Sequence, residues 1–133
     1  KDHPRTAEIL NNLGNLLHIK GDLDGGEFLN RRGLEIKEKV LGENHPSTAY
    51  SQLALARILH SKGDYIDAEP LYRKGIKIWK KTIPNHPNLV KAIDKYAKLL
   101  EETNRPGEAE KMRAKAQALK EKTQPDKSTD KRS

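Results

Sequence analysis

The sequence contains no cysteine among its 133 residues. Disulfide bonds, thiolate nucleophiles and cysteine-based zinc sites are therefore excluded, and the redox state of the compartment stays open. Large aromatic side chains are also scarce, with one tryptophan, one phenylalanine and four tyrosines. The sequence accordingly lacks the interleaved aromatic residues on which proteins stack the bases of single-stranded nucleic acid.

Long apolar stretches are missing as well. No run approaches the length of a membrane-spanning helix or of the apolar core of a signal peptide. The chain begins at Lys1 rather than at a methionine, and this start coincides with the start of a sequence repeat. We therefore expect a fragment of a longer protein. The compartment is not determined by the sequence, with a cytoplasmic location favoured.

Charged residues are as abundant as hydrophobic ones, at 34% each, which suits a water-soluble helical protein with a modest core. The net charge of +7 would suit an acidic partner, nucleic acid or an anionic membrane surface. However, basic and acidic residues alternate along the chain, as between Glu35 and Lys39. A solvated surface with a basic tail is therefore the favoured explanation of the charge.

A repeat of about 42 residues organises most of the chain. The dipeptide His-Pro begins at His3, His45 and His86, at steps of 42 and 41 residues, and Lys-Gly-Asp begins at Lys20 and Lys62, 42 residues apart. A fixed period in this range is typical of repeat architectures, in which each unit buries its apolar face against its neighbours. The predicted repeats are residues 3–44, 45–85 and 86–122, within a domain of residues 1–122 that is followed by a disordered basic tail at 123–133.

Each repeat is predicted to be a pair of helices joined by a tight turn. Proline follows each histidine, and proline is favoured at the first position of a helix. Gly21 and Gly63 supply the left-handed conformation that ends a helix, and Asp22 and Asp64 can cap the next one. The first helices then carry apolar residues at helical spacing, namely Leu10, Leu13 and Leu17; Leu53, Leu55 and Leu59; and Ile93, Tyr96 and Leu100.

Neither a metal site nor an active site is predicted. Three histidines share one repeat position and two share another, so equivalent imidazoles should lie roughly 8–10 Å apart on stacked helices. Zinc needs its ligands at about 2 Å, so these histidines are interpreted as helix-start and groove-wall residues. Serine and threonine lie mainly in linkers and turns, and carboxylates such as Glu101 and Glu102 lie at helix ends without an enclosed pocket. We therefore predict no enzymatic activity and no cofactor.

Small residues recur at three positions of the repeat: Gly14, Ala56 and Ala97; Gly26, Ala68 and Ala109; and Gly33, Gly75 and Ala116. Together with Tyr72 in the second helix of the second repeat, this pattern resembles the tetratricopeptide repeat, specifically the 42-residue variety of kinesin light chains and their bacterial relatives. Asn30 and Arg113 depart from the aromatic residue expected at the position of Tyr72. The resemblance covers residues 3–122 and implies an all-α, right-handed superhelical solenoid of three helix-turn-helix repeats.

The resemblance also implies a protein-interaction module that binds a peptide in a concave groove lined by the first helices. Helical spacing from the packing positions predicts the residues that face this groove. They are Asn11, Asn15, His18, Tyr50, Arg57, His60, Lys91, Asp94 and Lys98. The asparagines either hydrogen-bond a peptide backbone or are merely tolerated there, and both interpretations stay open.

Arg57 and Lys98 favour an acidic peptide, although Asp94 tempers the positive charge. The alternative is a structural role, in which an exposed apolar face near Ile9, Leu16 and Phe28 mediates self-association. Nucleic acid is disfavoured as a partner because base-stacking aromatic residues are lacking.

Overall fold

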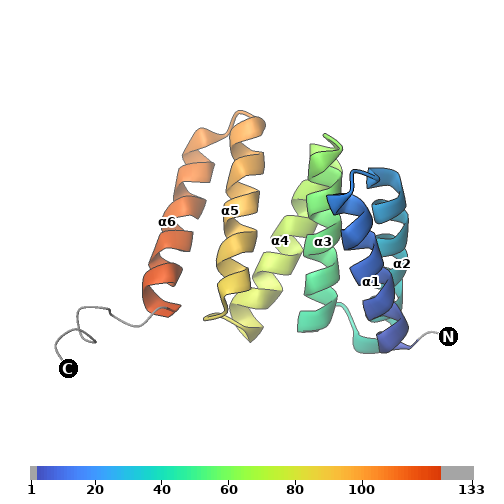
Figure 1. Cartoon of the computed structure of the whole chain (residues 1–133). Helices are drawn as coiled ribbons and strands as arrows, with labels where there is room; N and C mark the ends of the chain where they lie inside the picture. The colour runs from blue at the N-terminus through green and yellow to red at the C-terminus, as the bar shows by residue number, and fades with distance from the viewer. Residues whose placement is uncertain (1–2, 124–133) are drawn as a thin grey trace, which may run out of the picture. The chain divides into compact units, whose positions relative to one another are not determined.

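The computed structural model describes residues 3–123, and all regular secondary structure in that range is helical (Figure 1). The predicted all-α class is therefore confirmed. The helices are α1 (Pro4–Ile19), α2 (Leu23–Leu41), α3 (Pro46–Ser61), α4 (Tyr65–Thr82), α5 (Pro87–Glu102) and α6 (Pro106–Thr123). The rest of the predicted tail, residues 124–133, lies outside the described residues.

A histidine caps the first helix of each pair. The imidazole Nδ1 atoms of His3, His45 and His86 each accept a hydrogen bond, at 3.0 Å, from the backbone N–H two residues later. This bond satisfies one of the backbone donors that the first turn of a helix leaves without a partner. The proline after each histidine has no N–H to satisfy, so the dipeptide His-Pro is a compact helix start.

Tight turns join the two helices of each pair. Gly21 and Gly63 have φ angles of 95° and 83°, and Asn104 takes the same left-handed conformation in the third pair, with φ 63°. Asp22 then accepts a hydrogen bond from the backbone N–H of Gly25 and caps α2. The left-handed turns and the aspartate cap agree with the predictions from the sequence.

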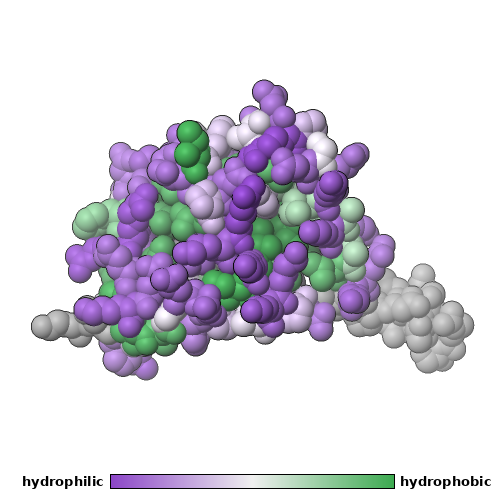
Figure 2. Space-filling view, turned by 180° about the vertical axis from the view of Figure 1, so that it is seen from behind, coloured by the Kyte–Doolittle hydropathy of each residue, from purple (hydrophilic) through white to green (hydrophobic). Residues whose placement is uncertain are grey.

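The helices form two compact units. Unit 1 contains α1 to α4, and unit 2 contains α5 and α6. Within unit 1, α2 packs on both α1 and α3, while α3 also pairs with α4. Unit 2 is a single pair in which α5 packs on α6. No described helix is both long and apolar enough to cross a membrane. Figure 2 shows one face of the molecule, on which hydrophilic residues predominate and hydrophobic ones form separate patches.

Small residues allow the helices of unit 1 to approach closely. A Cβ atom on Gly26 would lie 2.8 Å from the carbonyl oxygen of Gly14, so α1 and α2 touch backbone to backbone at this point. A Cβ atom on Gly75 would overlap the side chain of Leu53 across the α3–α4 interface. Larger residues at these two positions would therefore force the helices apart.

Leu13 corrects the predicted packing of α1. It was expected to pack with Leu10 and Leu17, yet 45% of its surface is exposed, whereas Leu55 at the same position of the next repeat is 1% exposed. The reason is that α2 covers α3 on this side, and no described helix covers α1 in the same way.

Gln52 is an unpaired polar residue in the core of unit 1. Its side chain is fully buried on α3, and neither its amide nitrogen nor its amide oxygen has a hydrogen-bond partner within the described chain. The equivalent positions of the other repeats hold Leu10 and Ile93. A buried amide without partners costs free energy because it gives up its hydrogen bonds to water.

We predict that Gln52→Leu stabilises the protein by about 1–3 kcal/mol, since leucine removes the unpaired amide and keeps a similar volume. The measurement is the free energy of unfolding from urea titration. Gln117→Leu, on the exposed surface of α6, is the matched control and should change it by less than about 0.5 kcal/mol. A Gln52→Leu variant less stable than the wild type would contradict the prediction.

We predict that His45→Ala destabilises the protein by about 0.5–2 kcal/mol, because the N–H of Ser47 loses its acceptor while no buried contact is lost. His45→Asn should restore most of this loss, since asparagine is a strong capping residue. Urea unfolding of the two variants tests both statements, and equal losses for alanine and asparagine would show that capping is not the role of His45.

Candidate functional site

Polar contacts join α1 to α3 along their length. The Glu8 carboxylate accepts a hydrogen bond from Ser47 Oγ at 3.2 Å, Asn15 Nδ2 donates to Tyr50 Oη at 2.9 Å, and His18 Nε2 lies 2.9 Å from Ser61 Oγ. We call the surface that carries Asn15, His18, Tyr50, Arg57 and Ser61 the α1–α3 face. It contains most of the groove residues that were predicted for the first two repeats.

Asn11 is not on that face, which corrects the prediction. Its side chain is fully buried, its amide nitrogen donates to Asn30 Oδ1 at 2.7 Å, and its amide oxygen accepts from Ser51 Oγ. Asn30 in turn donates to Asn15 Oδ1 at 3.3 Å and to the carbonyl oxygen of Gly26 at 3.2 Å. These amides form a buried network that ends at the α1–α3 face in Asn15.

The burial of Asn11 follows from its place in the repeat. It packs against Gly33, where an added Cβ would lie 2.6 Å from Asn11 Nδ2, just as Leu53 packs against Gly75. The position is therefore a helix-packing position. The apolar Leu53 at the same repeat position was the signal in the sequence that could have excluded Asn11 from the groove.

Two buried residues that were not among the predicted groove residues, Lys37 and Asn30, contact the residues of this face. The Lys37 side chain is fully buried, and its ammonium group lies 3.0 Å from the Glu8 carboxylate, 3.2 Å from the carbonyl oxygen of Ser47 and 5.2 Å from the centre of the Tyr50 ring. Lys37 thereby connects α2 to both α1 and α3. The ring of Tyr50 thus lies beside the ammonium group of Lys37, while its hydroxyl accepts the hydrogen bond from Asn15. Both contacts restrict the position of the Tyr50 ring.

The remaining predicted residues of unit 1 differ in accessibility. Arg57 is exposed on α3 and makes no hydrogen bond or ion pair with the described residues. His60 is half-buried, its Nδ1 lies 3.0 Å from Tyr72 Oη, and its ring meets those of Tyr65 and Tyr72 edge to face. His60 therefore mainly ties α3 to α4, whereas Arg57 is available for an external ligand.

An ion-pair cluster surrounds Lys62, which lies in the turn between α3 and α4. The Lys62 ammonium contacts the carboxylates of Asp24 at 2.6 Å and Glu27 at 2.7 Å. Its hydrogen bonds lower the pKa of both carboxyl groups, and the same bonds raise the pKa of Lys62. Since Lys62 precedes α4 and the acids lie on α2, the cluster links the first two helix pairs.

Unit 2 places the last three predicted residues on α5. Lys91 and Lys98 are exposed and Asp94 is half-buried. Beside them, Arg113 of α6 makes two hydrogen bonds, at 2.9 and 3.1 Å, to the carboxylate of Glu101. These bonds lower the pKa of Glu101. Arg113 and Glu101 occupy the same repeat positions as Tyr72 and His60. The second and third repeats therefore join their two helices at these positions by different polar contacts.

In residues 3–123, no three histidine, aspartate or glutamate side chains lie close enough together to hold a metal ion. The polar groups of the α1–α3 face are hydrogen-bond donors and acceptors on a helical surface, and this arrangement suits recognition of a second polar surface.

The comparisons with known proteins agree with this geometry. The model of the tetratricopeptide repeat family matches residues 5–81 and 55–122. No curated protein matches the chain. A solved structure of nearly identical TPR-like repeats, from a provisional kinesin light chain of Podosopora anserina, is 24% identical, with a TM-score of 0.82 over 94% of this chain and 60% of that one.

A second solved structure, BtubC (BKLC) from P. vanneervenii, is 16% identical, with a TM-score of 0.83 over 94% of this chain and 52% of that one. The chain thus spans little more than half the length of these structures. At this identity the likeness concerns the fold, while the family model covers most of the sequence. The fold of the chain is similar to that of the kinesin light chain repeats, and the chain belongs to the tetratricopeptide repeat family.

Proposed function

We propose that the chain binds an extended, acidic peptide segment of a partner protein on the α1–α3 face. The tetratricopeptide repeat is a protein-interaction scaffold and is generally non-catalytic. The observation that carries the proposal is the combination, on one face, of Asn15 and Tyr50 in a fixed orientation and an exposed Arg57 that has no hydrogen-bond or ion-pair partner within residues 3–123.

The hydrogen bonds within the α1–α3 face leave some donors and acceptors of Tyr50 and Asn15 for hydrogen bonds to a ligand. Tyr50 Oη accepts from Asn15, so its own hydroxyl proton is left to donate outward. Asn15 uses one amide proton and one oxygen lone pair within the protein, which leaves one donor and one acceptor. A peptide backbone presents the complementary C=O and N–H groups at regular spacing.

The sign of the charge favours an acidic ligand. The Arg57 guanidinium can bind a carboxylate through two parallel hydrogen bonds, and these are among the stronger interactions of their kind. In unit 2, Lys91 and Lys98 are likewise exposed on α5, the first helix of its pair. Asp94, also on α5, reduces the positive charge of these two lysines.

We predict that Arg57→Ala weakens binding of an acidic peptide, selected against the wild-type chain from a random library, by about 1–3 kcal/mol, because a charged hydrogen bond is lost. The matched control is Arg32→Ala on α2, which removes an exposed arginine outside the face. Isothermal calorimetry gives both affinities. Equal effects of the two substitutions would indicate general charge attraction and would contradict a site at Arg57.

A second candidate, self-association, rests on the uncovered side of α1. Ile9, Leu13 and Leu16 form a stripe that is 60%, 45% and 47% exposed, and Phe28 of α2 is 60% exposed. The equivalent residues of α3 are buried, and α2 packs on that helix. We propose that a second copy of the chain covers this apolar stripe of α1, just as α2 covers α3 within the chain. The two copies are related by a two-fold axis, so that the stripe of one copy packs on the stripe of the other.

We predict that the wild-type chain forms a weak dimer whose population rises with concentration, and that Leu13→Glu abolishes it by placing a charge in the apolar contact. Ile66→Glu is the control, since Ile66 is 86% exposed on α4, away from the stripe. Size exclusion with light scattering gives the mass of each variant. A wild-type monomer at all concentrations would exclude this second function without affecting the peptide site.

A further inference from the structure

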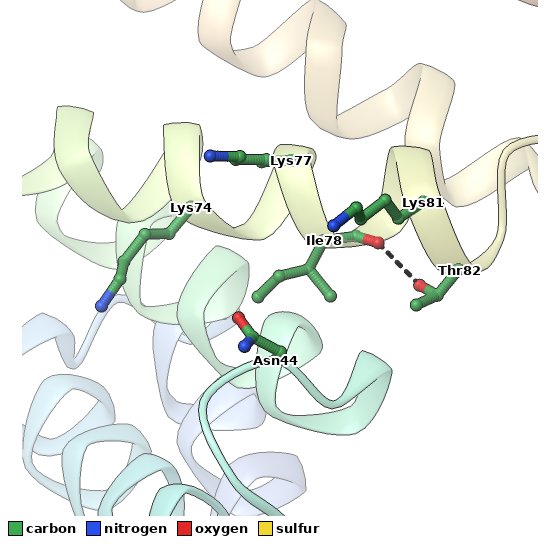
Figure 3. A pocket seen from close by; sticks show the side chains of 6 residues that line it. All are labelled: Asn44, Lys74, Lys77, Ile78, Lys81 and Thr82. Atoms are coloured by element: carbon green, nitrogen blue, oxygen red, sulfur yellow. Dashed lines mark hydrogen bonds between the residues drawn. The ribbon is translucent and has the colours of Figure 1, made fainter.

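A cavity of about 400 Å³ lies in unit 1 between α4 and the loop that joins α2 to α3. Figure 3 shows Asn44 of the loop facing Ile78 of α4, with lysine side chains along the same helix. The lining residues of α4 are Lys74, Lys77, Ile78, Lys81 and Thr82. Their spacing of three and four residues places them on one side of the helix. None of these residues belongs to the α1–α3 face.

The positive charge of the cavity is only partly neutralised. Lys74 lies 3.6 Å from the carboxylate of Glu43. Burial raises the pKa of Glu38, and the neighbouring Lys74 opposes this shift. By contrast, Lys77 and Lys81 form no hydrogen bond or ion pair with the described residues. Two ammonium groups on adjacent turns of α4 are therefore left for an external anion.

The other lining residues restrict which kind of anion the cavity can bind. The Thr82 hydroxyl donates to the carbonyl oxygen of Ile78 at 2.8 Å, so its proton is already used. The Asn44 amide supplies a neutral donor, and the side chain of Ile78 supplies an apolar wall. Hence the cavity combines two free cations, one amide donor and one apolar surface.

A phosphate monoester fits this set better than a carboxylate does. Its charge approaches −2 at neutral pH and matches two lysines, whereas a carboxylate carries a single negative charge and would neutralise only one of them. Lysine binds phosphate as a point charge without a demand for planar geometry. The apolar wall can accept the carbon atoms that link phosphate to a side chain. The lining holds no aromatic residue for base stacking, which disfavours nucleic acid.

We propose that this cavity binds a phosphoserine or phosphothreonine side chain of a partner protein, with Lys77 and Lys81 on the phosphate and Asn44 as an additional donor. The site is independent of the peptide proposed for the α1–α3 face. A partner could therefore occupy one, the other or both.

The first test is an NMR titration of the ¹⁵N-labelled full chain in phosphate-free, low-salt buffer. The probes are capped phosphothreonine, capped threonine and inorganic phosphate. We expect saturable shifts at the Asn44 side-chain amide and at the backbone of Lys77 to Thr82 with capped phosphothreonine, and none with capped threonine. Inorganic phosphate should bind at least threefold more weakly, because it lacks the apolar contact. Equal binding of inorganic phosphate, or no saturable shift, would overturn the proposal.

The second test separates the site from general charge. The double variant Lys77→Gln/Lys81→Gln should bind capped phosphothreonine at least tenfold more weakly. Lys111→Gln/Lys115→Gln removes the same charge at the same spacing from exposed positions on α6 and should stay within about twofold of the wild type. Asn44→Asp, which keeps both lysines, should also weaken binding. Equal losses in the two double variants would overturn the proposal.

A third measurement distinguishes the source of the phosphate. Vesicles of phosphatidylcholine with phosphatidylserine are sedimented with the wild type and with both double variants. We expect no retention that depends on Lys77 and Lys81. Retention that is lost with those two lysines, without binding of capped phosphothreonine, would assign the cavity to lipid headgroups and overturn the protein-ligand proposal.

Discussion

The close approach of paired helices at small residues is the constraint on which the rest of unit 1 depends. Gly14 and Gly26 bring the backbones of α1 and α2 into contact, and Gly75 receives the side chain of Leu53. Close packing at these glycines fixes the position of the two helices of a pair relative to each other. The side chains around the contact therefore form a defined surface against which the next pair packs. The position of α2 between α1 and α3, and hence the polar contacts of α1 with α3, follow from this closeness.

The same repeat position is used differently in each pair. The aromatic Tyr72 of the second repeat bonds to His60, whereas the third repeat has Arg113 paired with Glu101. In the first repeat the smaller Asn30 leaves room that the amides of Asn11 and Asn15 fill with hydrogen bonds. A buried polar network of this kind is tolerable only when its members find partners, and the partners of these three asparagines are one another, Ser51, Tyr50 and Gly26.

Much of the fold was predictable because its signals are local. A proline after histidine, a glycine at a left-handed turn and an aspartate after it act through their immediate neighbours, so their spacing alone predicted the six helices and their turns. The candidate site was less predictable. Helical spacing predicted a shared face for Asn15, Tyr50 and Arg57, but it also placed Asn11 there, although Asn11 packs against Gly33. Which side of a helix is covered depends on a partner helix distant in sequence.

The sequence by itself determined the repeat, the helix pairs, their caps and the family, since each of these depends on residue types at short range or at a fixed period. Only the tertiary structure decided that Lys37 is buried beneath Tyr50, that Leu13 is exposed while Leu55 is not, and that two lysines of α4 border a cavity with Asn44. The physical reason is that burial and charge compensation are properties of the packed surface. A lysine or a leucine carries the same local signal whether another helix covers it or not.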